Sequence, residues 1–189
     1  MFDTYVYRVI RNCEIKYDFY RPKAAGPAPI VVWIHGGALI GGGRGSMQPV
    51  VREMLAEKGF AQVSIDYRLA PETKLPEIID DVREAFRSIC EALPKQCSRD
   101  PTRVGVIGGS AGGYLTQMTG SAVAPRPKAL VSLYGYGDLV GPWYSEPDPF
   151  YCQSPRVSEE EARGVVGTEP VSETYRSGAD RFRFYLWCR

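Results

Sequence analysis

Four mainly apolar runs, separated by stretches with helical spacing, constrain the fold of this chain more than any other feature. The runs are residues 30–34, 60–65, 104–107 and 129–134. Continuous apolar runs are typical of strands that are covered on both faces, as in parallel sheets. The stretches between them repeat apolar residues every three or four positions, which predicts helices long enough for right-handed crossovers. The sequence therefore predicts an α/β fold with a mostly parallel sheet.

The N-terminal residues follow a different pattern. Residues 4–10 and 13–20 alternate apolar and polar side chains, and only Arg11 and Asn12 separate the two runs. Alternation with a two-residue connection is typical of a tight antiparallel hairpin. We therefore expect an antiparallel hairpin in front of the parallel strands.

Composition excludes several classes of protein. With 44% hydrophobic and 24% charged residues in a chain of 189, the sequence is typical of a globular protein, and one domain is the default. The 23 basic and 22 acidic residues give a net charge of +1, which argues against binding to nucleic acid or to an acidic membrane surface. No apolar run approaches the roughly 20 residues that span a bilayer, and the N-terminus lacks a signal-peptide pattern. We expect a cytoplasmic protein.

The five cysteines do not form a metal or redox motif. They are widely spaced and include no Cys-x-x-Cys pair, so we expect free thiols. The sequence predicts neither a metal nor a cofactor.

The strongest chemical motif is the segment Gly108–Gly113. It contains Gly-x-Ser-x-Gly centred on Ser110, after a predicted strand and at the start of a predicted helix. Glycines permit a turn tight enough to lift the Ser110 hydroxyl above the sheet, and the N–H of Ala111 at the helix start can stabilise an oxyanion. The alternative is a glycine-rich turn that holds a phosphate.

A second glycine-rich segment, His35-Gly36-Gly37-Ala38, follows the first buried strand. Glycines let backbone N–H groups come close to a substrate carbonyl, and Gly36 and Gly37 are the natural donors. The alternative is an ordinary loop. The Gly-x-Ser-x-Gly motif two strands later favours the oxyanion interpretation.

With residues 66–72, Asp-Tyr-Arg-Leu-Ala-Pro-Glu, these segments resemble the α/β-hydrolase superfamily, and within it the hormone-sensitive-lipase-like carboxylesterases. That family has His-Gly-Gly-Gly, Asp-Tyr-Arg-Leu-Ala-Pro-Glu and Gly-Asp-Ser-Ala-Gly-Gly in the same order. The resemblance covers residues 30 to about 140 and implies an α/β-hydrolase core over 1–140. It implies a serine hydrolase of small carboxylic esters, with Ser110 as nucleophile and with Gly36, Gly37 and Ala111 as the oxyanion hole.

The chain departs from this family in its catalytic base. His35 is its single histidine, and it matches the family's oxyanion-loop histidine rather than the base. Asp138, at the end of the fourth predicted strand, could mimic the acid, since some hydrolases place it there. In the family that this chain resembles, however, that position is only the end of a Ser-Pro-Trp-x-Asp-Leu-like segment. The triad acid and histidine are therefore expected to be missing from this chain, which leaves at most traces of esterase activity.

Residues 141–189 break the strand–helix rhythm and are rich in aromatic residues. Helices are predicted to begin at Ser158, which has capping-box spacing to Glu161, and at Ser177. The second helix has no stop signal, so we expect a substrate-covering lid segment that is truncated. Arg181 and Arg183 are expected on a solvated face. Six aromatic residues are either pocket-lining or core residues: Tyr134, Tyr136, Trp143, Tyr144, Phe150 and Tyr151.

Other functions stay open at this stage. Amide hydrolysis and sugar deacetylation fit the same motifs. A complete chain without a base would be a non-catalytic binding protein for a small hydrophobic ligand. Alternatively, a second chain would supply the missing strands and histidine. The sequence does not indicate an oligomeric state.

Overall fold

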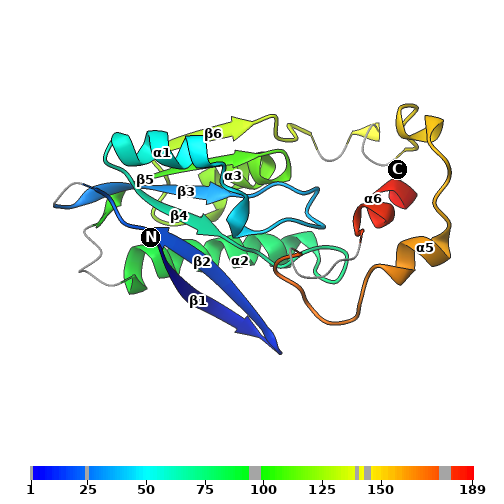
Figure 1. The fold of residues 1–189 in the computed structure, drawn as a ribbon, viewed down its shortest axis with the longest axis horizontal. Coiled ribbons are helices and arrows are strands. Elements are labelled where there is room, and N and C mark those ends of the chain that lie inside the picture. The colour runs from blue at the N-terminus through cyan, green and yellow to red at the C-terminus, as the bar shows by residue number, and fades with distance from the viewer. Residues whose placement is uncertain (1, 24–25, 94–98, 139–140, 143–145, 175–179) are drawn as a thin grey trace.

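The computed structural model describes residues 2–23, 26–93, 99–138, 141–142, 146–174 and 180–189. Their strands form one six-stranded sheet in the order β1-β2-β4-β3-β5-β6 (Figure 1). The strands are β1 (Phe2–Ile10), β2 (Cys13–Tyr20), β3 (Ala28–Ile34), β4 (Ala61–Ile65), β5 (Arg99–Gly109) and β6 (Ala129–Leu133). β3 to β6 pair in parallel, whereas β1 and β2 are antiparallel. This confirms the predicted α/β fold with its N-terminal hairpin.

The helices of the sheet region occur where the apolar spacing predicts them. They are α1 (Pro49–Glu57), α2 (Leu75–Arg87) and α3 (Ala111–Ala122), and a π-helical turn at Ser88–Ala92 follows α2. Pro76 lies in the first turn of α2, where a missing N–H costs nothing. Gly59, with φ of 80°, follows the end of α1 in the left-handed conformation that favours glycine.

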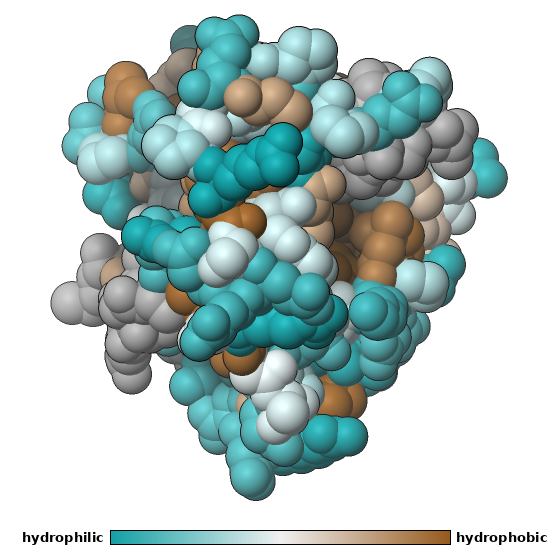
Figure 2. All heavy atoms as spheres, turned by 90° about the vertical axis from the view of Figure 1, so that its right-hand side faces the viewer, coloured by the Kyte–Doolittle hydropathy of each residue, from teal (hydrophilic) through white to brown (hydrophobic). Residues whose placement is uncertain are grey.

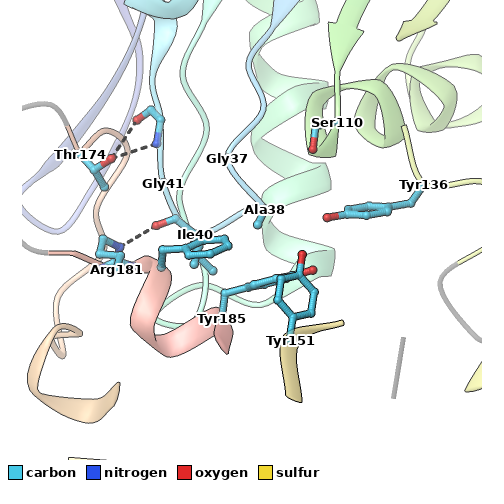
Figure 3. A pocket seen from close by; sticks show the side chains of 12 residues that line it. Gly37, Ala38, Ile40, Gly41, Ser110, Tyr136, Tyr151, Thr174, Arg181 and Tyr185 are labelled. Carbon is cyan, nitrogen blue, oxygen red and sulfur yellow. Dashed lines mark hydrogen bonds between the residues drawn. The ribbon is translucent and has the colours of Figure 1, made fainter. Parts of the chain in front are cut away.

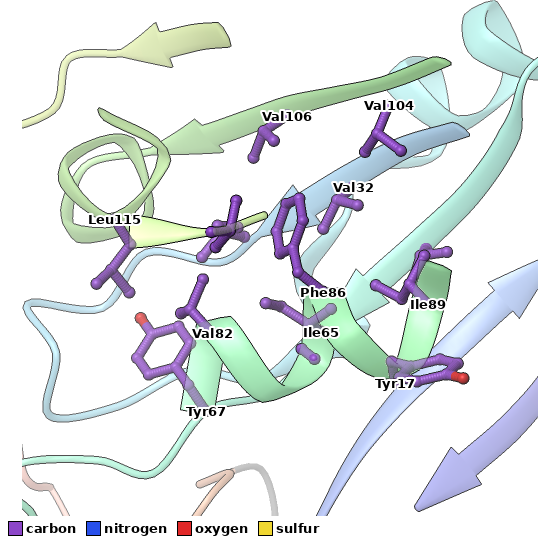
Figure 4. Packing of buried hydrophobic residues seen from close by; sticks show 14 of the residues in the cluster. Tyr17, Val32, Ile65, Tyr67, Val82, Phe86, Ile89, Val104, Val106 and Leu115 are labelled. Carbon is purple, nitrogen blue, oxygen red and sulfur yellow. The ribbon is translucent and has the colours of Figure 1, made fainter. Parts of the chain in front are cut away.

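The main core lies between one face of the sheet and helices α2 and α3 (Figure 4). Successive side chains of β3 point to opposite faces of the sheet. Ile30, Val32 and Ile34 belong to this core, whereas Val31 and Trp33 are buried outside it. The opposite face carries polar contacts, since the indole N–H of Trp33 donates to Ser46 at 3.4 Å. Because both faces are covered, the strands are apolar throughout, as the sequence indicated.

β6 lies at one edge of the sheet of described residues, as expected from its position as the fourth parallel strand. Its side chains are less covered than those of the central strands, with Leu130 40% and Val131 42% exposed. β1 forms the other edge.

The C-terminal segment contributes a short 3-10 helix, η4 (Tyr151–Gln153), and two helices, α5 (Glu159–Gly164) and α6 (Phe182–Cys188). Ser158 and Glu161 form the predicted capping box at the start of α5. The predicted start of the second helix, Ser177, lies outside the described residues. Figure 1 shows α5 and α6 beyond the end of the sheet toward which the parallel strands point.

Two further features concern the described part of the chain only. None of its helices combines the length and the apolar character needed to cross a bilayer. Cys13, Cys90, Cys152 and Cys188 are free thiols, as predicted, and Cys97 lies outside the described residues.

Candidate active site

Ser110 occupies a strained turn between β5 and α3. Its φ of 55° and ψ of −123° lie in a region that side-chain-bearing residues rarely adopt. The turn is held from both sides, because the Ser110 N–H donates to Leu133 O at 2.9 Å and its carbonyl accepts from the Tyr114 N–H at 3.1 Å. The Ser110 side chain is thereby presented at the end of the sheet (Figure 3).

Glycines surround Ser110 because neighbouring backbone approaches too closely for a Cβ. A Cβ on Gly112 would lie 2.1 Å from Ile34 O, and one on Gly108 would lie 2.3 Å from Gly112 O. A Cβ on Gly36 would meet Gly109 O at 2.8 Å and Ser110 Cβ at 3.3 Å. The loop after β3 and the turn after β5 are therefore in direct contact.

The loop after β3 is tightly folded. Gly37 has φ of 111°, and its carbonyl accepts from the N–H groups of Ile40 at 2.9 Å and Gly41 at 3.0 Å. Ala38 and Leu39 have φ of 53° and 63°, two consecutive left-handed residues without glycine. We call residues 36–42 the glycine loop. Its shape depends on contacts with the rest of the molecule, since such conformations cost free energy.

His35 supports this loop from inside the core. Its ring is fully buried and stacks on Tyr67, with ring centroids 4.2 Å apart. Nδ1 lies 2.7 Å from Gly36 O, and the Tyr67 hydroxyl donates to His35 O at 2.9 Å. Burial lowers the pKa of His35 to about 4, so the ring is neutral at pH 7. A neutral ring can donate from Nδ1 to Gly36 O and so hold the glycine loop.

A cavity of about 410 Å³ lies beside Ser110, and we call it the serine cavity. Its walls come from the glycine loop, Ser110, and residues far apart in the sequence. These are Gly37, Ala38, Ile40, Gly41, Gly42, Ser110, Tyr136, Tyr151, Thr174, Arg181, Phe182 and Tyr185. Figure 3 shows the rings of Tyr136 and Tyr185 directed into the space next to Ser110. The cavity thus joins the Ser110 side chain, the glycine loop and aromatic walls.

The sequence left six aromatic residues as either pocket-lining or core residues, and two of them, Tyr136 and Tyr151, line this cavity. Tyr134 and Phe150 are 79% and 72% exposed instead. Trp143 and Tyr144 lie outside the described residues. Asp138, the residue considered as an acid, is exposed and accepts from the Gly141 N–H at 3.0 Å.

Arg181 is the site residue that sequence reasoning placed wrongly. Instead of a solvated face, it occupies a buried position with 7% exposure. It donates to both carboxylate oxygens of Glu72, to Ile40 O at 2.6 Å and to Ala70 O at 2.7 Å. Arg181 can be buried because carbonyl groups and a carboxylate provide partners for all parts of its guanidinium. Arg183, 47% exposed and paired with Glu161, lies on the surface as expected.

Thr174 is a second contact that the sequence did not reveal. Its Oγ1 accepts from the Gly42 N–H at 2.9 Å, and its own N–H donates to Gly42 O at 3.0 Å. No motif signals this residue, because the pairing joins positions 132 residues apart. For Phe182 and Tyr185, which line the serine cavity, the sequence signal is the run of aromatic residues after Arg181.

The described residues contain no cluster of three or more acidic, cysteine or histidine side chains suited to a metal ion. The polar side chains around Ser110 are hydroxyls and one paired guanidinium. The arrangement can place a carbonyl next to a serine hydroxyl under backbone N–H donors, which is the geometry of acyl transfer.

Comparisons with known proteins agree with this geometry. The family model BD-FAE matches residues 17–142. Among solved structures, an α/β hydrolase superfamily protein from Enterococcus faecalis is 25% identical with a TM-score of 0.75, covering 99% of this chain and 64% of that one. A bacterial heroin esterase is 37% identical with a TM-score of 0.54, over 61% of this chain and 37% of the esterase.

Curated relatives are much longer proteins. The non-reducing polyketide synthase Preu6 of Preussia isomera is 32% identical over 94% of this chain, but over 9% of its own length. The synthase atr1 of Stereocaulon alpinum is 35% identical over 70% of this chain and 6% of its own length. The chain therefore spans less than a tenth of these relatives.

Proposed function

Because the chain belongs to the BD-FAE family of α/β hydrolases, we propose that it is a serine hydrolase unit for carboxylic esters. Ser110 is the proposed nucleophile. The backbone N–H groups of Gly36, Gly37 and Ala111 are the proposed oxyanion hole. One observation carries the proposal: Ser110 stands on a strained turn in contact with the glycine loop and lines the serine cavity.

The proposed mechanism begins with attack of the Ser110 Oγ on the ester carbonyl carbon. The carbonyl π electrons move to oxygen, and the serine proton must be accepted by a base. The first N–H groups of α3 have no partner within the helix, so the Ala111 N–H can donate to the resulting oxyanion. Collapse of this intermediate expels the alcohol and leaves an acyl group on Ser110, which water then removes.

The base is the missing part of this mechanism. His35 is fully buried, does not line the serine cavity and is engaged with Gly36 O. We propose that it positions the loop and takes no proton from Ser110. A serine hydrolase that lacks its histidine keeps only a small part of its acceleration. In this chain we propose that bulk water or hydroxide takes the Ser110 proton, so we expect slow turnover that still depends on Ser110.

We propose that residues 141–189 act as a lid over Ser110. This rests on the contribution of Tyr151, Phe182 and Tyr185 to the serine cavity. Burial together with the Tyr151 hydroxyl raises the pKa of Tyr185, so its hydroxyl stays protonated at neutral pH. The lid would exclude water and offer hydroxyl donors to a substrate.

The decisive test is hydrolysis of p-nitrophenyl acetate by the chain and by Ser110→Ala. We expect slow turnover in the parent and loss of the protein-dependent rate in the variant. Ser121→Ala on the exposed face of α3 is the matched control and should hydrolyse at the parent rate. Equal rates for the parent and Ser110→Ala would contradict the proposal. If ligands still bound, that result would favour a non-catalytic binding protein for hydrophobic ligands.

The similarity to polyketide synthases supports a refinement. The match to Preu6 covers 94% of this chain, including most of the segment after β6. We propose that the acyl group is delivered as an activated ester or thioester of a polyketide-like acid. Comparing an acyl N-acetylcysteamine thioester with the matching oxygen ester tests this refinement. A Ser110-dependent rate that is higher for the oxygen ester would contradict it.

A further inference from the structure

A second cavity, of about 360 Å³, is also lined by residues of the glycine loop, and we call it the apolar cavity. Its walls come from the glycine loop, the beginning of α2 and helix α6. They are Ala38, Leu39, Ile40, Ala70, Leu75, Ile78, Phe184, Tyr185, Cys188 and Arg189. Arg189 is the single charged side chain in this wall, and its guanidinium pairs with Asp148 at 3.1 Å. The remaining wall is hydrocarbon, ring or thiol.

The two cavities share part of their walls. Ala38, Ile40 and Tyr185 line both of them. Figure 3 shows Ala38 and Tyr185 between Ser110 and the helix that carries Tyr185. The two cavities therefore adjoin at these three side chains. The polar groups lie at the Ser110 end, and the apolar groups lie at the other end.

We propose that the apolar cavity binds the hydrocarbon part of the acyl group whose carbonyl is attacked by Ser110. This inference rests on the proposed function, because it assigns part of the same substrate. A cavity of about 150 Å³ lined by aliphatic and aromatic side chains stays dry and binds benzene. The apolar cavity is more than twice that size, so it suits an aryl group or an alkyl chain of several methylenes.

The surrounding surface favours a small ligand over a broad docking partner. The face that carries α5 and α6 is mostly hydrophilic, and its hydrophobic side chains form separate small patches beside a hollow (Figure 2). A group that enters the apolar cavity and buries each of its methylenes there gains about fourfold in affinity per methylene. A charged acyl chain would lose affinity, because Arg189 already has its carboxylate partner.

Cys188 offers a test that does not depend on hydrolysis. It lines the apolar cavity and is exposed enough to react with N-ethylmaleimide. Cys152 is also exposed but lies in the wall of neither cavity described above, so it is an internal control. The experiment measures alkylation of each cysteine by peptide mass spectrometry in the full chain. The added ligands are 2-butanone, 2-hexanone and 2-octanone, whose carbonyl imitates the ester and cannot be hydrolysed.

We expect protection of Cys188 at ketone concentrations that fall about fourfold per added methylene, with Cys152 unaffected. Protection that is absent, that does not depend on chain length, or that is equal at Cys152 would overturn the inference. Protection without ketone that increases with protein concentration would show that a second copy covers the cavity, and would also overturn it.

A kinetic comparison separates this inference from the proposed function. Cys188→Trp should lower the ratio of octanoate to acetate ester hydrolysis at least tenfold, whereas Cys152→Trp should leave the ratio unchanged. A length-dependent protection of Cys188 in a chain with no Ser110-dependent hydrolysis would support the inference and contradict the function. Ser110-dependent hydrolysis with an unchanged octanoate-to-acetate ratio in Cys188→Trp would support the proposed function and contradict the inference about the apolar cavity.

Discussion

The sheet region and the C-terminal segment are held in place by different forces. The sheet region, residues 2–138, buries a continuous cluster of apolar side chains between its strands and helices α2 and α3. The segment 146–189 buries few apolar side chains and leaves Phe150, Phe182 and Trp187 exposed. It is attached through polar contacts, namely Arg181 with Glu72, Thr174 with Gly42, and the Leu69 N–H with Val171 O at 2.8 Å.

This difference bears on the site, which is formed where the two regions meet. Ser110 and the glycine loop belong to the sheet region, whereas Tyr151, Thr174, Arg181 and Tyr185 belong to the segment. Polar contacts fix geometry through direction, but they contribute less free energy than a core. Ser110, the proposed nucleophile, therefore lies in the region with the apolar core, and we expect the segment to detach from that region separately.

The largest expected effect is on the core. Phe86 is fully buried in the cluster, and Phe86→Ala should lower the free energy of unfolding by about 3–5 kcal/mol. Urea unfolding followed by tryptophan fluorescence measures this change. Leu130→Ala on the edge strand β6, where the side chain is 40% exposed, should cost less than about 1 kcal/mol. Equal losses in the two variants would show that the edge strand β6 is packed as tightly as the centre of the core.

The second effect concerns the attachment of the segment. Arg181→Met leaves the Glu72 carboxylate, with 1% side-chain exposure, without its cation. Breaking one partner of such a pair costs about 3–5 kcal/mol. Because the segment buries little apolar surface, we expect it to detach while the sheet stays folded. Limited proteolysis should then cut within 141–189 at least tenfold faster, with unchanged far-ultraviolet circular dichroism of the core fragment.

Arg183→Met is the matched control for this prediction. Arg183 pairs with Glu161, but both side chains are about half exposed. Exposed pairs are worth about 0.2–1 kcal/mol, so cleavage should accelerate by less than about fivefold. If Arg181→Met instead unfolded the whole chain, the two regions would form one cooperative unit and the comparison would fail.

The same difference explains what the sequence could predict. The strands and helices of the sheet region follow from apolar periodicity. The glycines of residues 35–38 and 108–113 mark two segments that the structure brings into contact. Arg181 and Thr174 could not be placed from the sequence, because a buried polar contact has no periodic signature. Arg181 depends on Glu72, 109 residues away, and on carbonyls such as Ile40 O, which any residue type would supply. Only the folded chain brings these partners together.

As the pH falls, the sheet region should begin to lose stability before the attachment of the segment weakens. Burial lowers the pKa of His35 from 6.5 to about 4, so the unfolded chain binds a proton at His35 more readily than the folded chain does. The contribution of neutral His35 to the free energy of unfolding is therefore complete above pH 6.5 and is lost as the pH falls toward 4. The loss amounts to about 3 kcal/mol in the sheet region. Burial alone would raise the pKa of Glu72, but hydrogen bonds from Arg181 lower it overall. The attachment of the segment is therefore lost only below pH 4.5, as pH falls through the lowered pKa.

The measurement is the free energy of unfolding from pH 7 to pH 4 for the chain and for His35→Asn. The two curves must be subtracted because other groups also change the free energy of unfolding over this range. Burial raises the pKa of Asp66 from 3.8 to about 6, so Asp66 stabilises the folded chain as the pH falls, opposite to His35. The variant should lack the His35 part of the pH dependence, and its difference from the parent should shrink toward pH 4. A difference that is constant with pH would mean that His35 is not neutral and buried in the folded chain.

The smallest effect tests a single hydrogen bond between the regions. Thr174→Val removes the hydroxyl that accepts from the Gly42 N–H at 2.9 Å, whereas Thr174→Ser keeps it. The backbone bond from the Thr174 N–H to Gly42 O is unchanged in both variants. Loss of one hydrogen bond costs about 1 kcal/mol, so amide exchange at Gly42 should accelerate about fivefold in the valine variant and not in the serine variant. Because this bond joins the glycine loop to the segment alone, exchange at Val32 in the central strand β3 should not change. Acceleration at both amides would mean that the segment stabilises the sheet as well as the loop, and the two regions would then no longer be separable.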